Sequence, residues 1–298
     1  QACIGHYHAG VPIGCAVNAR TGRERTFAAR HARHGSRRLL VFGGGPAGAA
    51  AAIEAARAGD DVTLVERDAE LGGQLRLAGH APAHAELWER YRRSTRARLN
   101  AAGVPVRLDT EADADLAGGF DAVVLATGAR PYLPPVPAAS ASLVAAWDAI
   151  REPQAVAGPV LVADWGGGWD GIDAAERLAS AGTRVTLACA GVVVGETLHQ
   201  YQRNLYLARL DELGVAILHH HELALDGNEL GLRHVFSGTP RALPDVATVV
   251  LAQGRVPADE LWSALEAHPS AVRAGDVLGP RTLEEAVLEG TRAAIDFN

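Results

Sequence analysis

Four residues in the first quarter of the sequence have the types and spacing needed to hold a nucleotide. Gly43, Gly45 and Gly48 form the pattern G-x-G-x-x-G, and Glu66 lies 18 residues after Gly48. In this pattern the first glycine permits a sharp turn, the second lets the backbone approach a pyrophosphate, and the third allows close helix–strand packing. An acid at the distance of Glu66 accepts hydrogen bonds from an adenosine ribose. These residues therefore predict a binding site for an adenosine diphosphate group.

The neighbouring sequence supplies the elements that must position these residues. We expect a strand at 38–42, an alanine-rich helix after the glycines, and a second strand at 62–65 that ends at Glu66. The start of the helix then points at the phosphates, where its backbone N–H groups favour an anion. A glycine-rich turn alone need not bind anything, but strand, helix, second strand and acid together favour a nucleotide site. The contacts expected here are Gly43, Gly45, Pro46, Ala47, Gly48, Glu66 and Arg67.

Two further stretches accompany this first site. The segment Leu71–Leu75 contains a glycine pair, which lets the backbone approach a second part of a ligand. An apolar run within 120–126 fits a strand that is buried on both faces of a parallel sheet. This run leads into the small residues Ala126–Gly128. The proline-rich segment 131–137 then predicts a crossover between domains.

Residues 158–190 repeat the strand–turn–helix–strand pattern imperfectly. Asp164 stands where the first glycine is expected, the third glycine, Gly171, comes two residues late, and Trp165 and Trp169 crowd the loop. A carboxylate repels phosphate, and bulky side chains obstruct the approach of a pyrophosphate to the backbone. After the second strand there is neither an acid for a ribose nor an arginine for a 2′-phosphate. We expect the fold of a nucleotide domain here, whereas NAD(P)H binding stays uncertain.

A second candidate site lies at the N-terminus. Cys3, His6, His8 and Cys15 supply thiols and imidazoles within a short stretch, and such ligands suit zinc or an iron–sulfur cluster. Their spacing fits no zinc-finger pattern well. Two interpretations therefore remain open, a metal site formed by these four residues and a remnant loop without a metal.

Composition narrows the possible partners. The chain has 298 residues with 48% hydrophobic and 21% charged residues, which is ordinary for a globular protein. A net charge of −7 argues against nucleic acid as the main partner. No apolar run reaches the ~18 residues that a membrane-spanning helix needs. Three cysteines are too few for a disulfide framework and no signal peptide is visible, so we expect a cytoplasmic protein.

The first residue is Gln1 rather than an initiator methionine, and the cysteine motif follows at once. We expect from this that the sequence is the interior of a longer polypeptide, a processed chain, or a subunit whose first part is encoded elsewhere.

Several motifs together resemble the C-terminal half of one flavoprotein group, the trimethylamine dehydrogenase and 2,4-dienoyl-CoA reductase group of Old Yellow Enzyme-related flavoproteins. The resemblance covers nearly the whole chain. In that group an N-terminal β/α-barrel carries FMN and the substrate site, a four-cysteine loop holds a [4Fe–4S] cluster, and two disulfide-reductase-like domains follow. The matching residues are Cys3-Ile4-Gly5, Val17-Asn18, Gly22-Arg23-Glu24, Gly43–Gly48, Leu71–Leu75, Ala126-Thr127-Gly128, Gly275-Asp276, Pro280-Arg281-Thr282 and Glu285-Ala286.

The resemblance implies that the first of the two domains binds FAD or, as in the amine dehydrogenases, ADP. The glycine loop and Glu66 would hold the ADP portion. Gly73 and Gln74 would lie near the far end of the cofactor, and Asp276 would contact the ribityl chain of FAD. The remaining members of the implied cofactor site are Ala126, Thr127, Gly128 and Gly275.

Two departures from that group change the expectations. The barrel is absent from this sequence, so FMN and the substrate site would be on a partner subunit or segment. In the cysteine loop, Cys3 and Cys15 take the outer positions, His6 takes the second, and the third falls near Ala9. The loss of two thiolates argues against an ordinary [4Fe–4S] cluster. The altered second glycine loop resembles the amine dehydrogenase branch, in which electrons leave to an electron-transfer protein.

The sequence thus predicts an α/β fold with two Rossmann-like, disulfide-reductase-type domains, the second inserted in the first. The expected ranges are 1–36 for the Cys/His loop and linker, 37–150 with 245–298 for the FAD/ADP domain, and 151–244 for the inserted domain. No residue pattern suggests a catalytic acid, base or nucleophile. One hypothesis is an oxidoreductase component that passes electrons between a partner FMN barrel and an external donor or acceptor. The other is a non-catalytic ADP-binding scaffold that stabilises a barrel partner.

Overall fold

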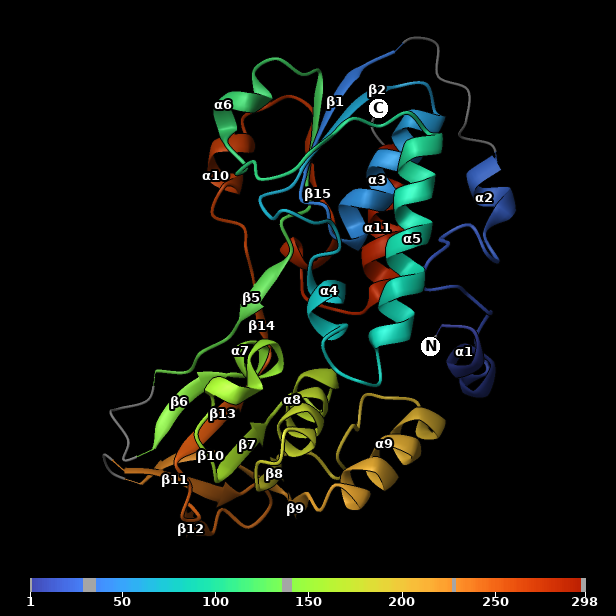
Figure 1. Cartoon of the computed structure of the whole chain (residues 1–298). Helices are drawn as coiled ribbons and strands as arrows, with labels where there is room; N and C mark the ends of the chain where they lie inside the picture. The colour runs from blue at the N-terminus through green and yellow to red at the C-terminus, as the bar shows by residue number, and fades with distance from the viewer. Residues whose placement is uncertain (1, 29–35, 136–140, 227–228, 296–298) are drawn as a thin grey trace. The chain divides into compact units, whose positions relative to one another are not determined.

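The computed structural model describes residues 2–28, 36–135, 141–226 and 229–295, which form two compact units (Figure 1). Unit 1 consists of the ranges Gln1–Arg76, Leu87–Arg130 and Val256–Asn298, and unit 2 of Leu77–Glu86 and Pro131–Arg255. Within the described ranges, no helix combines the length and the apolar character that crossing a membrane requires.

A five-stranded parallel sheet forms the centre of unit 1, with the order β15-β4-β1-β2-β3. Successive side chains of a strand face opposite sides. Leu39 and Val41 of β1 therefore pack in the core with helix α3 (Pro46–Arg57), whereas Leu40 and Phe42 pack in the core on the other face. Burial on both faces explains why these strands are continuously apolar. The strands are β1 (Arg38–Phe42), β2 (Asp61–Val65), β3 (Val106–Arg107), β4 (Ala122–Leu125) and β15 (Ala271–Arg273).

Helices cover both faces of this sheet. On one face α3 packs closely against α11, because Gly290 of α11 has no side chain where the Ala47 backbone approaches (Figure 1). On the other face Ala117 of α6 and Leu265 of α10 join the core. The helices of unit 1 are α1 (Ile4–Ala9), α2 (Glu24–Ala28), α3 (Pro46–Arg57), α5 (Ala85–Ala101, which starts in unit 2), α6 (Ala114–Ala117), α10 (Trp262–Leu265), α11 (Leu283–Ile295) and the 3-10 turn η2 (Gly275–Val277); α4 (Gln74–Ala78) begins in unit 1 and ends in unit 2.

Unit 2 repeats the parallel arrangement with the strand order β6-β13-β7-β8-β9. Helices α7, α8 and α9 contribute to the core on one face of this sheet, and a three-stranded antiparallel sheet, β10-β11-β12, contributes to the core on the other. The elements are β6 (Ser142–Ala145), α7 (Ala146–Arg151), η1 (Pro153–Ala155), β7 (Val160–Asp164), α8 (Trp169–Ser180), β8 (Val185–Cys189), α9 (Gln200–Glu212), β9 (Ala216–His219), β10 (His221–Asp226), β11 (Glu229–His234), β12 (Pro240–Ala242) and β13 (Thr248–Ala252).

The chain enters and leaves the larger part of unit 2 through two paired strands, β5 (Ala129–Pro131) and β14 (Arg255–Pro257). The two parallel sheets with helix crossovers, and the insertion of one unit in the sequence of the other, confirm the predicted fold class.

The two units divide the sequence at other places than the predicted domain boundaries at 150/151 and 244/245. Residues 131–150 and 245–255 belong to unit 2, because β6 pairs with β13 and β13 pairs with β7 in the sheet of that unit. The segment Leu77–Glu86 also belongs to unit 2, although the sequence analysis assigned it to the first domain. Buried strands alone could not reveal which sheet each of them joins.

Candidate nucleotide-binding site

The three glycines of the G-x-G-x-x-G pattern, two in the turn between β1 and α3 and one in the first turn of α3, have different surroundings. Gly43 has a φ of +99°, and a Cβ there would overlap the backbone of Ala126 at the end of β4. A Cβ at Gly48 would overlap the carbonyl oxygen of Gly43, so the helix can pack on the turn only with glycine at this position. Around Gly45, by contrast, no heavy atom of the described residues would lie within 4 Å of a Cβ. The backbone is therefore tightly packed around Gly43 and Gly48, and there is open space around Gly45.

The open position is also the start of α3. Gly45 is the N-cap of this twelve-residue helix, Pro46 begins it, and the described side chains give the N-cap no hydrogen bond. The N–H groups of a first helical turn have no partner within the helix, and they attract anions. The open space and these N–H groups together can hold a phosphate group.

Glu66 lies directly after β2 and is held beside the glycine loop. Its Oε2 accepts the N–H of Gly44 at 2.6 Å and its Oε1 accepts the N–H of Asp68 at 2.9 Å. The residue is only 7% exposed. A carboxylate has about four lone-pair sites, so this fixed orientation leaves capacity for ribose hydroxyls. Arg67, also predicted as a contact, has a side chain that is 69% exposed, and its Nε lies 3.9 Å from Oδ1 of Asp68.

The second glycine pair lies next to the loop. Gly72 and Gly73 both have positive φ, +127° and +52°. The N–H of Gly72 donates to the carbonyl of Gly44 at 2.9 Å, and a Cβ on Gly73 would lie 3.3 Å from the Cα of Gly45. The two glycine segments therefore form adjacent walls of one site.

Gly275 and Asp276, the predicted cofactor contacts near the C-terminus, lie beside Gln74 and the start of α3. Gln74 donates from Nε2 to Oδ2 of Asp276 at 3.0 Å, and Oδ1 of Asp276 accepts the N–H of Arg281 at 3.0 Å. Gly275 has a φ of +78°, and a Cβ there would come 2.6 Å from the Cβ of Ala47. The turn before α11 thus lies against the first turn of α3.

The turn after β4 has a mixed role. The backbone of Ala126 packs directly against Gly43. Gly128, with a φ of +79°, lies close to the side chain of Gln74. The hydroxyl of Thr127 donates to the carbonyl of Ala258 at 2.7 Å, so this side chain anchors a neighbouring loop. Sequence reasoning missed Glu289, whose Oε2 accepts the N–H of Gly275 at 2.9 Å, because nothing local marks an acid within α11 as a partner of that turn.

The four residues of the predicted metal site do not come together. His6 contacts Glu284 through Nε2 and the carbonyl of Pro12 through Nδ1, both at 3.1 Å. Cys3 is exposed and Cys15 is half-buried. Across the described ranges, no three His, Cys, Asp or Glu side chains are arranged so that they could hold a metal ion. The metal site formed by these four residues therefore stays a prediction from the sequence.

The glycine loop of unit 2 differs from that of unit 1 because a carboxylate fills it. Asp164 ends β7, is 3% exposed, and accepts the N–H of Gly167 through Oδ1 at 3.0 Å. A Cβ at Gly171 would lie 2.7 Å from this carboxyl group, so the group sits under the first turns of α8. Burial raises the pKa of Asp164 to about 7; the Gly167 N–H opposes this rise, and the charge of Asp170 adds to it.

The segment that follows β8 covers the same loop. The carbonyl of Gly167 accepts the backbone N–H of Thr197 at 3.1 Å and its hydroxyl at 2.9 Å. Glu196 accepts the N–H of Val192 at 3.0 Å, and a Cβ at Gly191 would overlap its carboxylate. In folds of this kind a dinucleotide lies at the carboxyl ends of the strands, over the glycine loop. In unit 2 the chain itself occupies that place.

The buried carboxyl group predicts a pH-dependent stability. A carboxyl group with a raised pKa contributes stability that is fully present below its ordinary pKa of about 3.9 and is lost as the pH rises toward the folded value. We expect Asp164→Asn to become more stable relative to the wild-type chain by up to about 4 kcal/mol between pH ~4 and pH ~8. Urea denaturation at several pH values measures this difference. A difference that stays constant with pH would contradict the assignment.

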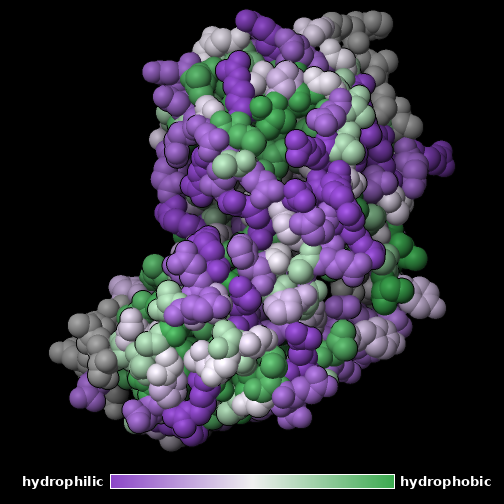
Figure 2. All heavy atoms as spheres, viewed as in Figure 1, coloured by the Kyte–Doolittle hydropathy of each residue, from purple (hydrophilic) through white to green (hydrophobic). Residues whose placement is uncertain are grey.

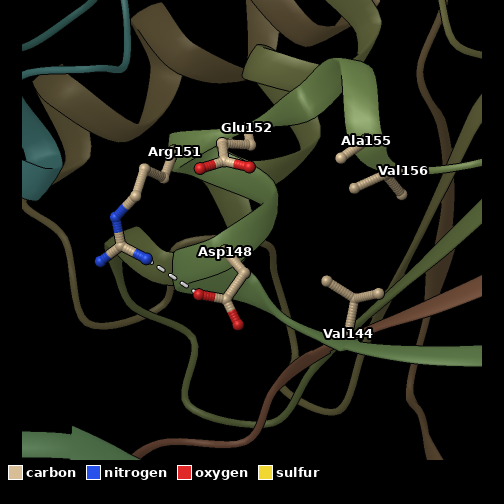
Figure 3. A pocket seen from close by; sticks show the side chains of 6 residues that line it. All are labelled: Val144, Asp148, Arg151, Glu152, Ala155 and Val156. Carbon is tan, nitrogen blue, oxygen red and sulfur yellow. Dashed lines mark hydrogen bonds and ion pairs between the residues drawn. The ribbon is translucent and has the colours of Figure 1, made fainter.

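Unit 2 also contains a small pocket of about 210 Å³ beside α7 (Figure 3). Figure 3 shows Arg151 paired with Asp148, at 2.9 Å, on one side of the pocket and Val144, Ala155 and Val156 on the other. None of the residues expected to bind a cofactor lines it. The pocket is therefore not the candidate site.

Comparison with known proteins places this geometry in a family. The family model described as pyridine nucleotide-disulphide oxidoreductase matches residues 37–275. The chain belongs to this family. The first glycine loop and the two Rossmann-like units agree with this assignment.

The individual relatives are longer than this chain. A probable N-methylproline demethylase from Rhizobium meliloti is 32% identical over 90% of this chain and 40% of its own length. An NADH oxidase from Thermoanaerobacter brockii is 35% identical over 62% of this chain and 29% of its own length. The solved structure of a 2-naphthoyl-CoA reductase complex has a TM-score of 0.87 at 26% identity, covering 99% of this chain and 45% of the other. The resemblance to one half of the Old Yellow Enzyme-related flavoproteins is confirmed, and the chain spans less than half of these relatives.

Proposed function

We propose that this chain binds FAD, or ADP in the same place, at the start of α3 and serves as the nucleotide-binding component of an electron-transferring oxidoreductase. The observation that carries the proposal is the contrast between the two glycine loops. The loop of unit 1 is open at Gly45 and has Glu66 beside it, whereas the loop of unit 2 is filled by Asp164 and covered by Thr197.

The residues of unit 1 have separate tasks in this proposal. The N–H groups at the start of α3 bind the pyrophosphate, and Glu66 orients the adenosine ribose. Gly73 and Gln74 flank the far end of the nucleotide, and Asp276 orients its polyol hydroxyls. Bound FAD would supply the electron-accepting and electron-donating chemistry, while the protein fixes its orientation and electrostatics.

The partner in this proposal is a β/α-barrel segment or subunit that carries FMN. The relatives extend well beyond the part that this chain matches, which supports a further segment or subunit that works together with it. The N-terminal stretch also has unusually exposed apolar side chains, and Figure 2 shows hydrophobic atoms on the surface at α1. Apolar patches of this kind mark interaction surfaces. The exposed residues are Ile4, Tyr7, Val11, Ile13 and Val17.

The closed loop of unit 2 supports an electron-transfer protein, rather than NAD(P)H, as the external partner. We therefore expect that NADH and NADPH do not reduce the flavin of this chain at a catalytic rate. The reduction is measured under anaerobic conditions as the loss of the flavin absorbance at about 450 nm. Chemical reduction with dithionite is the positive control. Saturable reduction by either nicotinamide would contradict the proposed role of unit 2.

A second function, a non-catalytic ADP-binding scaffold for a barrel partner, is favoured by one observation. Both carboxylate oxygens of Asp276 already accept protein donors, from Gln74 and from the backbone of Arg281. The protein therefore holds this carboxylate in place without a bound flavin, as an ADP-only site requires, and its remaining lone pairs are free to accept polyol hydroxyls if FAD is bound.

A visible spectrum of the purified chain distinguishes the two functions. Flavin bands near about 370 and 450 nm, which belong to the cofactor, support the redox function. A colourless chain that releases ADP on denaturation supports the scaffold and excludes an electron-transferring flavin in this chain.

A further inference from the structure

A short stretch of the chain is anchored on unit 2 while the chain on both sides of it belongs to unit 1. This segment is Leu77–Glu86. Leu77 and Ala83 pack against the largest core cluster of unit 2, and Ala81 is completely buried. The N–H of His84 donates to the carbonyl of Ala81 at 3.0 Å, which folds the segment back on itself.

His84 makes the polar contact that fixes the segment to helix α8. Its Nε2 lies 3.1 Å from Oδ1 of Asp173, and the two side chains are only 14% and 3% exposed. The imidazole ring stands edge-on to Trp169 with the ring centres 4.5 Å apart, and its centre is 6.0 Å from that of Tyr206. A buried carboxylate is strongly disfavoured without a cation, so Asp173 needs either the charge of His84 or a proton of its own.

The other charged groups around this pair are largely acidic. Arg209 forms an ion pair with Glu176, which leaves His84 as the cationic partner in contact with Asp173. The segment itself carries two more titratable side chains, His80 and Glu86. From α8, Asp173 and Glu176 interact electrostatically with His84, and Asp170 interacts with Asp173. From α9, Tyr206 lies beside the imidazole ring, and Arg209 interacts with Glu176 and Tyr206.

The directions of the pKa shifts agree with one another. Burial alone would lower the pKa of His84, but Asp173 and Glu176 outweigh it and the pKa is raised. Burial raises the pKa of Asp173 and of Glu176. A raised pKa in the docked state means that docking binds protons more tightly. The stabilisation is therefore complete below the ordinary histidine pKa of about 6.5 and is lost as the pH rises through the raised value of His84.

We propose that His84 and Asp173 form a proton-dependent latch that holds Leu77–Glu86 on unit 2 and releases it when the shared proton is lost. His84 is a positioning residue in this arrangement. Helix α4 connects the latch to the nucleotide site, because it begins at Gln74, which donates to Asp276, and ends inside the latched segment. Release of the segment would therefore allow α4, which carries Gln74, to move. The effect of this movement on nucleotide binding rests on the proposed function, whereas the latch itself does not.

Hydrogen exchange followed by mass spectrometry tests the latch in the full chain. We expect the protection of amides in Leu77–Glu86 to fall about tenfold per pH unit above the midpoint, after correction for intrinsic exchange, because one proton is linked to docking. Helix α3 serves as the internal reference, and its corrected protection should not change over the same range.

Variants make the test specific. His84→Gln, which cannot carry the charge, should show low protection of the segment at every pH and no step. Asp173→Asn removes the need for a cation and should keep protection without a step, so it remains informative if His84→Gln folds poorly. His219→Gln, at an exposed histidine of unit 2, should keep the wild-type step. A wild-type chain whose segment stays equally protected from about pH 6 to about pH 9, or a step that persists in His84→Gln, would overturn the proposal. Because the readout is the segment itself, loss of nucleotide binding would not produce either result.

Discussion

Replacing Gly45 with aspartate is expected to abolish nucleotide binding while leaving the fold intact. A Cβ at Gly45 would meet no described heavy atom within 4 Å, so we expect the fold to tolerate the substitution. The new carboxylate brings a negative charge to the place proposed for the pyrophosphate. Two like charges about 4 Å apart near a protein surface repel by roughly 4 kcal/mol. Since each 1.4 kcal/mol is a factor of ten, affinity for FAD or ADP should fall at least about 100-fold.

Unit 2 offers a matched control for this substitution. Gly166 lies in the second glycine loop, two residues before Gly168, the N-cap of α8, and a Cβ at Gly166 would also meet no described heavy atom within 4 Å. Gly166→Asp adds the same charge and should leave nucleotide affinity unchanged. Isothermal titration with FAD and with ADP measures both variants. Equal losses in the two variants, or none in Gly45→Asp, would show that the first loop is not the binding site.

The second large effect concerns Gly290 in α11, where a side chain would separate two helices. A Cβ at this position would overlap the carbonyl of Ala47 at the start of α3. Overpacking of a core typically costs 1–3 kcal/mol, and here the obstacle is backbone rather than a movable side chain. We expect Gly290→Val to lower the free energy of unfolding by about 3 kcal/mol. It should also weaken nucleotide binding, because α11 carries Glu289, which holds Gly275.

Gly279 provides the comparison for that substitution. It lies just before α11, and a Cβ there would have open space around it. Gly279→Val should therefore change the free energy of unfolding by less than about 0.5 kcal/mol, as is usual for surface substitutions. Urea denaturation followed by circular dichroism measures both variants. If the two variants were equally stable, the close approach of α11 to α3 would not be essential to unit 1.

Features set by short sequence patterns could be predicted well. The G-x-G-x-x-G spacing predicted the turn before α3, and in the structure only glycine fits at Gly43 and Gly48. The strands expected at 38–42 and 62–65 are observed as Arg38–Phe42 and Asp61–Val65. Apolar periodicity and turn residues act over a few positions, so one sequence suffices to recognise them.

Features that depend on distant parts of the chain could not be predicted. Gln74 meets Asp276, and His84 meets Asp173, across long stretches of sequence. Sequence reasoning recognised Asp164 as an obstacle to phosphate, but not that it binds the N–H of Gly167. His6 was a candidate metal ligand because thiols and imidazoles lie nearby in the sequence, whereas in the fold its Nε2 lies 3.1 Å from Glu284 of α11. Side-chain pairs of this kind are fixed only by the fold.

The nucleotide released from the purified, denatured chain tests the central claim most directly. Chromatography and mass spectrometry of the released material identify the nucleotide and give its amount per chain. The account predicts FAD or ADP in about equimolar amount from the wild-type chain and from Gly166→Asp, and almost none from Gly45→Asp. A wild-type chain that releases no adenine nucleotide, and takes up neither FAD nor ADP when they are added, would contradict it.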